Sequence, residues 1–169
     1  MRKILKAIDG TNEFVGNALK WLAPVIMVLI TIQVFLRYVL GKPGDVLPIL
    51  MIAGGATLYV LGWGYVYHQD RHVRVDVFYA RWSPRTKALI DVIGSLIWLL
   101  PWLAFLAFIS GKWAWVSYDT NEWWTLTYWR PPLWPMRTTI FVGVLLLAFQ
   151  SLAQLYRNFY MLVRNRAYD

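Results

Sequence analysis

The stretch Val46-Leu-Pro-Ile-Leu-Met-Ile-Ala-Gly-Gly-Ala-Thr-Leu-Tyr-Val-Leu-Gly-Trp-Gly-Tyr-Val-Tyr67 contains no charged residue. A helix needs about 20 apolar residues to cross a bilayer core of about 30 Å, because each residue advances the helix by about 1.5 Å. Lipid also tolerates only segments that satisfy their own backbone hydrogen bonds. The stretch therefore predicts a membrane-spanning helix at about residues 46–67.

Three further apolar runs flank this one, at about residues 15–40, 84–110 and 136–157. Overall, 59% of the residues are hydrophobic and 15% are charged, whereas about a quarter are charged in a soluble domain. We expect an all-α integral membrane protein with four transmembrane helices in one domain, residues 1–169. Ser83 and Pro84 predict the start of the third span, because serine caps a helix and proline suits its first position. Pro101 predicts a kink within that span.

The apolar run at residues 46–67 contains several glycines. Gly54, Gly55 and Gly62 predict a close-packing face toward a partner helix, because lipid supplies no hydrophobic drive between helices and small residues let backbones approach. The alternative is that glycine is simply frequent in membrane helices.

A charged segment, His68-Gln-Asp-Arg-His-Val-Arg-Val-Asp76, follows the run. We interpret residues 68–83 as a solvated connector that ends in a short amphipathic interfacial helix, at about residues 77–82. Because valine alternates with charge after His72, part of the connector is expected to be extended and half-buried. Our hypothesis is a latch in which Asp76 caps the following helix and pairs with His72 or Arg74.

The latch hypothesis predicts that Asp76→Asn and His72→Ala lower the midpoint of thermal unfolding and weaken complex assembly. Unchanged stability and assembly in both variants would rule the latch out.

The segment at about residues 111–135 is rich in tryptophan and is expected to be a loop. Six of the eleven tryptophans of the chain lie there or at its edge: Trp113, Trp115, Trp123, Trp124, Trp129 and Trp134. Tryptophan favours the membrane interface, and it is also enriched with arginine at protein interfaces. The loop is therefore interpreted as an interfacial belt, as a docking surface built on Trp123, Trp124, Arg130 and Trp134, or as both.

The lysines and arginines divide unequally between the two ends of the spans. Five of the seventeen lie on the side of the tryptophan-rich loop, namely Arg37, Lys42, Lys112, Arg130 and Arg137. By the positive-inside rule, both termini and the connector are expected in the cytoplasm, and the loop is expected outside. The basic start, Met1 to Lys6, resembles a signal peptide, but without a small-residue cleavage site it is read as leading into an uncleaved first span.

The polar residues offer little for catalysis or ion binding. Thr31 and Gln33 are the main polar groups expected within the spans, and Asp91 lies near a helix start, where pairing with Lys87 is favoured over an ion-ligand role. Both histidines, His68 and His72, stand on one segment, which does not suit the two axial ligands of a haem or a zinc site. With no cysteine, no enzyme, cofactor or metal is expected, and the dispersed basic residues do not suggest nucleic acid.

Several strings together resemble one transporter family. These are Arg37-Tyr-Val39, Gly62 through His72-Val-Arg-Val-Asp76, Arg81-Trp-Ser-Pro84 with Asp91, and Pro131-Pro-Leu-Trp-Pro135. They resemble the small membrane subunit, or Q component, of tripartite ATP-independent periplasmic transporters over about residues 20–157. One departure is Gly44-Asp-Val-Leu-Pro48, where the family often has a tryptophan and an acidic pair and this chain has only Asp45.

The resemblance implies a subunit of the bacterial inner membrane that works with a large multi-span permease and a periplasmic binding protein. That complex would import an organic anion of carboxylate or sulfonate type by sodium symport, with sodium bound in the large subunit. The Q component would serve as a scaffold and as part of the docking surface, in contact with membrane lipids. The alternatives are a membrane anchor of a respiratory enzyme, which needs haem or quinone ligands, and an autonomous small carrier.

Overall fold

The computed structural model describes residues 2–42, 44–69 and 83–164. This part of the chain is helical, apart from turns and one isolated antiparallel β-bridge between Trp123 and Pro132. Four helical stretches are long and apolar enough to cross a membrane: Arg2–Tyr38, Val46–His68, Arg85–Asp119 and Trp134–Arg164. The expected all-helical class, with four long apolar helical stretches that are candidate membrane spans, is therefore confirmed.

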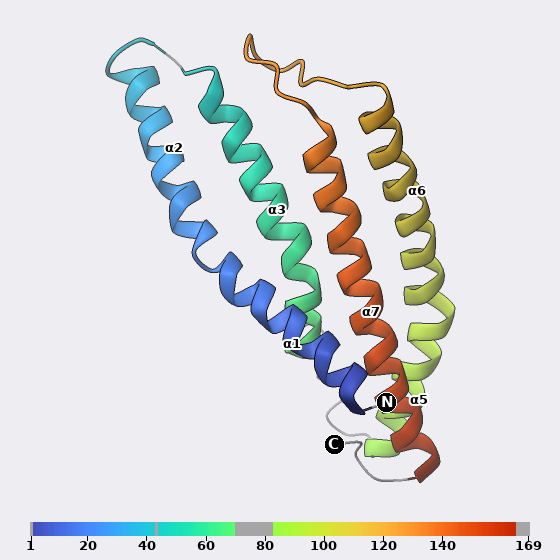
Figure 1. Ribbon diagram of the computed structural model, residues 1–169. Helices are drawn as coiled ribbons and strands as arrows, with labels where there is room; N and C mark the ends of the chain where they lie inside the picture. The colour runs from blue at the N-terminus through green and yellow to red at the C-terminus, as the bar shows by residue number, and fades with distance from the viewer. Residues whose placement is uncertain (1, 43, 70–82, 165–169) are drawn as a thin grey trace.

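The helices form a layered bundle with α7 in the middle (Figure 1). Helix α7 (Trp134–Arg164) packs against α3 (Val46–His68) on one side and against α6 (Leu100–Asp119) on the other. Helix α1 (Arg2–Leu19) crosses the end of α3 and also touches α7, while α2 (Leu22–Tyr38) lies along the other half of α3. The start of α1 and the end of α7 lie at one end of the bundle, and the 120–133 loop lies at the other.

The first span differs from the expected 15–40, because the helix begins far earlier and is broken. Helix α1 forms because it buries Leu5, Asn12 and Gly16 against its neighbours. The break falls at Lys20 and Trp21, one turn before Pro24. Proline has no backbone N–H to donate to the carbonyl four residues earlier, so an unbroken α-helix cannot continue through this point.

The third span begins at α5 (Pro84–Gly94), where Ser83 caps the helix as expected: its Oγ accepts a hydrogen bond from the Thr86 amide at 3.2 Å. A π-helical turn, η1 (Ser95–Leu99), separates α5 from α6. In this turn the Leu100 amide bonds to the Ser95 carbonyl, five residues back. The distortion expected from Pro101 takes this form, because the proline removes the next regular hydrogen bond.

Helix α6 continues to Asp119, so residues 111–119 are helical and the expected loop shrinks to residues 120–133. The reason is a buried stripe at helical spacing, Ser110, Ala114 and Ser117, which faces the rest of the bundle. Trp113 and Trp115 belong to this helix and are 60% and 69% exposed. Two of the six tryptophans assigned to the loop are therefore helical residues on the outer surface.

A close backbone contact between α3 and α7 is made at Gly143, a glycine that was not among those predicted to pack. A Cβ on Gly143 of α7 would lie 2.8 Å from the carbonyl oxygen of Val60 on α3. The backbone of α3 cannot move away as a flexible side chain would, so only glycine fits here. Gly16 and Gly64 also have no room for a Cβ, against Tyr65 and Asn12.

We predict that Gly143→Ala lowers the stability of the detergent-solubilised chain by about 1–3 kcal/mol, the usual range for overpacking. For a chain of this size, each kcal/mol lowers the midpoint of thermal unfolding by about 2–4 °C. Gly55→Ala is the matched control, because a Cβ on Gly55 meets nothing within 4 Å. Equal midpoints for the two variants would contradict the close contact between α3 and α7.

Candidate functional site

The structure describes only the two ends of the charged connector, residues 68–69 and 83. His72, Arg74 and Asp76 lie outside the described residues, as does the expected interfacial helix at 77–82, so the latch stays a prediction. His68, expected in a solvated connector, is instead the last residue of α3 and points into the bundle. Its Nδ1 lies 3.2 Å from Oδ1 of Asp9 on α1.

Asp9 is the centre of a polar cluster that joins α1, α3 and α7. Its carboxylate accepts hydrogen bonds from both terminal nitrogens of Arg157, with Nη1 at 3.3 Å, and from Nε2 of Gln150 at 2.9 Å. Asn12 donates to Oε1 of Gln150 at 2.8 Å, and both amide side chains are at most 1% exposed. We call Asp9, Asn12, His68, Gln150 and Arg157 the inner polar cluster.

The inner polar cluster suits packing better than chemistry. Its one carboxylate and one histidine are too few for a metal site, and no group of three or more potential metal ligands occurs within residues 2–42, 44–69 and 83–164. The charges of Asp9 and Arg157 compensate each other, and charge-assisted hydrogen bonds of this kind are the strong ones. The cluster therefore fastens α1 to α7 and α3.

The sequence interpretation missed this cluster. It treated the spans as almost free of polar groups apart from Thr31 and Gln33, yet Gln150 and Ser151 are fully buried in α7. Two signals were present in the sequence: a glutamine deep in an apolar run, and Asp9 as the first acidic residue of a basic segment. Neither signal identifies the partner, because 141 residues separate Asp9 from Gln150.

At the opposite end of the bundle, the 120–133 loop is folded on itself. The amide of Trp124 donates to the carbonyl of Pro131 at 3.0 Å, and that of Leu133 donates to the carbonyl of Glu122 at 2.8 Å. An ion pair of 2.7 Å between Arg137 on α7 and Glu122 ties the loop to the bundle. The loop is thus a hairpin-like structure with its own contacts.

The loop buries one of the four residues expected at the docking surface, Trp124, and exposes Trp123, Arg130 and Trp134. Trp124 is only 8% exposed and holds the loop from inside, whereas Trp123 is 55% exposed. Trp134 packs edge-on against Tyr118, with ring centroids 5.8 Å apart. Two large side chains not chosen from the sequence, Leu126 and Tyr128, are 66% and 93% exposed.

A polar cavity of about 330 Å³ lies where the loop meets the start of α3. It is lined by Asp45, Thr125, Leu126, Thr127, Tyr128 and Arg130. Arg130 is exposed, as expected for a docking residue, and Asp45 brings an opposite charge from the turn between α2 and α3. The cavity therefore offers both signs of charge beside exposed apolar side chains.

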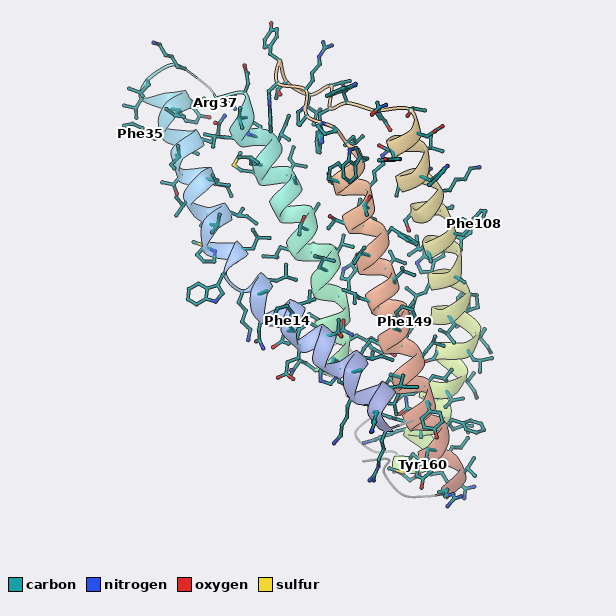
Figure 2. The ribbon with its side chains drawn as sticks, viewed as in Figure 1. Phe14, Phe35, Arg37, Phe108, Phe149 and Tyr160 are labelled. Carbon is teal, nitrogen blue, oxygen red and sulfur yellow. The ribbon has the colours of Figure 1, made fainter. Side chains whose placement is uncertain are left out.

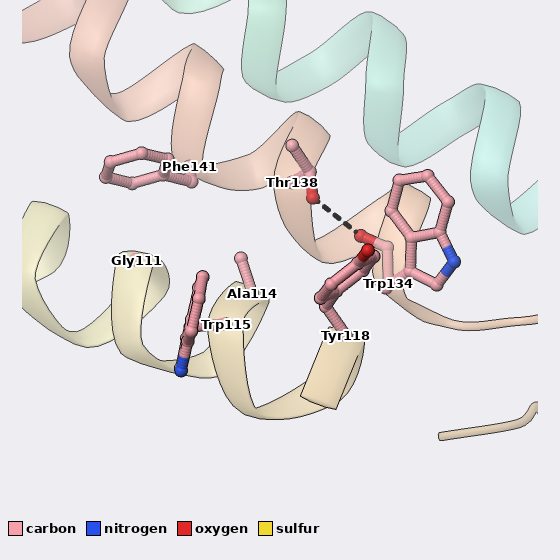
Figure 3. A pocket seen from close by; sticks show the side chains of 7 residues that line it. All are labelled: Gly111, Ala114, Trp115, Tyr118, Trp134, Thr138 and Phe141. Carbon is pink, nitrogen blue, oxygen red and sulfur yellow. Dashed lines mark hydrogen bonds between the residues drawn. The ribbon is translucent and has the colours of Figure 1, made fainter. Parts of the chain in front are cut away.

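A second groove, also about 330 Å³, separates α6 from α7 near the same end (Figure 3). Phe141 and Trp115 form its two walls, and Tyr118 and Trp134 close it toward the loop. The groove exists because Gly111 has no side chain: a Cβ there would lie 3.0 Å from the Phe141 ring. Its lining is aromatic, as is typical of the membrane interface.

The remaining predicted residues lie on α2, α3 and α5. Gly54 faces Ile26 of α2, so its small size serves a contact within the chain, whereas a Cβ on Gly55 or Gly62 meets nothing within 4 Å. Arg37 stands at the loop end of α2 (Figure 2), with its guanidinium 5.7 Å from the Tyr38 ring centroid. Asp91 lies in α5. These residues do not converge on one site.

The comparison with protein families decides the class. The family model described as "Tripartite ATP-independent periplasmic transporters, DctQ component" matches residues 26–160. The chain belongs to the DctQ family. No curated protein and no solved structure matches the chain.

Membership confirms the resemblance derived from the sequence. A DctQ component is a membrane subunit of a transporter and not an enzyme. Because the transporters are tripartite, a DctQ component belongs with a large membrane subunit, DctM, and a periplasmic binding protein. This DctQ protein is accordingly a multi-pass membrane protein of a bacterial transporter.

The inner polar cluster predicts the effect of removing its central charge. In Asp9→Asn, Arg157 loses its charged partner within the bundle, so we expect a loss of about 1–3 kcal/mol in the free energy of unfolding. Glu13→Gln, an exposed change one turn away on α1, is the matched control and should be nearly neutral. Thermal unfolding in detergent measures both, and a stable Asp9→Asn variant would show that the cluster does not hold α1.

Proposed function

We propose that this chain is the small permease subunit of a sodium-driven transporter that imports an organic anion of carboxylate or sulfonate type. Its membrane is the bacterial inner membrane. A periplasmic binding protein delivers the anion, the large subunit binds sodium and moves the substrate, and the DctQ chain supports the large subunit. The chain also supplies part of the surface on which the binding protein docks.

The scaffold role is supported by the contacts of the polar side chains, which join helices of this chain to one another. The inner polar cluster is engaged in contacts between helices of the same chain. In contrast, α2 has no buried residue, and Gly55 and Gly62 leave open space on α3. An apolar helix with so little internal packing is suited to contact the large subunit or lipid.

The proposed orientation places both termini and the charged connector in the cytoplasm. In the sequence, twelve of the seventeen lysines and arginines belong to the N-terminal segment, the connector with the start of the third span, and the C-terminal segment: Arg2, Lys3, Lys6, Lys20, Arg71, Arg74, Arg81, Arg85, Lys87, Arg157, Arg164 and Arg166. The bias toward lysine and arginine sets orientation by the positive-inside rule. The 120–133 loop then faces the periplasm, where the binding protein is found.

The docking role is supported by the exposed surface of the loop. Leu126 and Tyr128 project beside the cavity that contains Arg130 and Asp45. Exposed tyrosine and arginine next to a concave surface are typical of interface hot spots. We therefore propose Trp123, Leu126, Tyr128 and Arg130 as the docking residues, with Trp124 and Trp134 supporting them.

We predict that Tyr128→Ala and Arg130→Ala raise the binding-protein concentration needed for half-maximal uptake. A hot-spot side chain contributes at least about 1–2 kcal/mol, so the increase should be roughly five- to thirtyfold. The maximal rate at saturating binding protein should not change, because neither residue moves substrate. The measurement is uptake by the reconstituted three-component transporter over a range of binding-protein concentrations.

Lys112→Ala is the control for the loss of a positive charge outside the loop, and it should leave the half-maximal concentration unchanged. Unaltered uptake by both loop variants at limiting binding protein would argue against docking at the loop. A lower maximal rate at every concentration would instead indicate defective assembly.

A further inference from the structure

Helix α1 is not needed to cross the membrane. Helix α2 alone has 17 residues and is about 26 Å long, close to a bilayer core of about 30 Å. The stretch Arg2–Tyr38, which contains α1, the break and α2, has 37 residues, or about 56 Å if helical throughout, which is far more than the core requires. The helix breaks at Lys20 and Trp21, and lysine and tryptophan are residues that favour the membrane boundary.

Helix α1 presents three different faces at 100° per residue. One face is buried and carries Leu5, Asn12 and Gly16. The second is charged and polar, and its exposed members are Arg2, Lys3, Lys6, Glu13, Asn17 and Lys20. The third is apolar and exposed, with Ile4 at 64% and Phe14 at 75%, and Figure 2 shows the position of Phe14 on α1. An exposed apolar face beside a basic face is the pattern of a helix that lies in the membrane interface.

The basic face of α1 carries more positive than negative charge. Asp9, the acid nearest to it on the buried side, is already bound by Arg157. Among the residues that the structure describes, Arg2, Lys3 and Lys6 form no ion pair. Glu13 is the one exposed acid on α1, so the first turns of the helix carry excess positive charge.

An apolar crevice of about 230 Å³ lies beside these turns, between α1 and α7. Its lining consists of Ile4, Leu5, Ile8, Leu152, Ala153 and Tyr156. Ile4 and Leu5 stand directly between Lys3 and Lys6 in the sequence. The crevice lies on the flank of α1 between its buried face and its exposed apolar face, whereas Lys3 and Lys6 lie on the opposite flank of the same turns. The first turns therefore offer an apolar crevice on one flank and positive charge on the other, which fits a surface of lipids with anionic head groups and hydrocarbon chains.

We propose that α1 lies in the head-group layer of the membrane and binds anionic phospholipid. Lys3, Lys6 and Arg2 bind the lipid phosphates, Phe14 and Ile4 dip into the acyl region, and the crevice between α1 and α7 takes an acyl chain. Each basic residue near an anionic surface strengthens binding by roughly fivefold. The inner polar cluster supports this arrangement, because it fixes which face of α1 turns toward the membrane.

Adjacent cysteine variants test the position of α1. The chain has no cysteine, so Glu13→Cys and Phe14→Cys each introduce a single thiol, and both side chains are exposed in the protein itself. In lipid nanodiscs, where both membrane faces meet water, a charged maleimide should modify Glu13→Cys at least tenfold faster than Phe14→Cys. In denaturant the two rates should be equal.

Equal rates in nanodiscs would overturn the interfacial position of α1. Protection of Phe14→Cys that appears only after the large subunit is added would also overturn it, because the apolar face would then be a protein interface.

Charge variants test the choice of lipid. Native mass spectrometry of the full chain, with phosphatidylglycerol and phosphatidylcholine competing, should show a preference for phosphatidylglycerol. Lys3→Gln/Lys6→Gln should reduce that preference by roughly 25-fold, from two residues at about fivefold each. Lys42→Gln/Lys112→Gln removes the same charge at the other end of the bundle and should leave the preference intact.

No phosphatidylglycerol preference in the unmodified chain, or the same loss in both charge variants, would overturn lipid binding by α1. These outcomes are independent of uptake, so they do not depend on the proposed transport function.

Discussion

The bundle depends on close approach at α7, because lipid does not drive apolar helices together as water does. At Gly143 the backbone of α7 meets the backbone of α3 with no room for a methyl group. One end of the same helix pair is fixed by the inner polar cluster, in which Asp9 and Arg157 compensate each other's charge. Close packing of small residues and the inner polar cluster thus act together with a small apolar core that includes Ile49, Leu103 and Val144, while many other large apolar side chains are exposed (Figure 2).

The spans were readable from the sequence because their signal is local. The uncharged run at Val46–Tyr67 and the cap at Ser83 need no distant partner to be recognised, and the family resemblance rests on similar short strings. Helix α1 was missed because its middle, Asp9 to Glu13, is polar or glycine, and its stability comes from contacts with α3 and α7. The same holds for residues 111–119, where conspicuous aromatics concealed the buried stripe of Ser110, Ala114 and Ser117.

The candidate sites were less predictable than the fold, for a physical reason. Exposure of a tryptophan depends on tertiary contacts: Trp123 and Trp124 are neighbours, yet one is exposed and the other is buried. Likewise, Gly54 and Gly55 are adjacent, and only Gly54 meets a side chain, Ile26. Residue type marks a surface as suitable for binding, whereas the helix rotation that decides which member of a pair faces outward is set by distant residues.

The internal hydrogen bonds of the 120–133 loop affect how a partner protein would associate with it and dissociate from it. The backbone of the loop is already fixed by the hydrogen bonds of the Trp124 and Leu133 amides and by the Glu122–Arg137 ion pair. A protein that binds Leu126 and Tyr128 therefore does not have to order the loop backbone. The entropy lost on association is then limited to side chains. Contact through such a preorganised loop needs little area to be specific, and a small contact is released quickly. Fast release suits the proposed partner, a periplasmic binding protein, because an empty copy must be replaced by a substrate-loaded copy in every transport cycle.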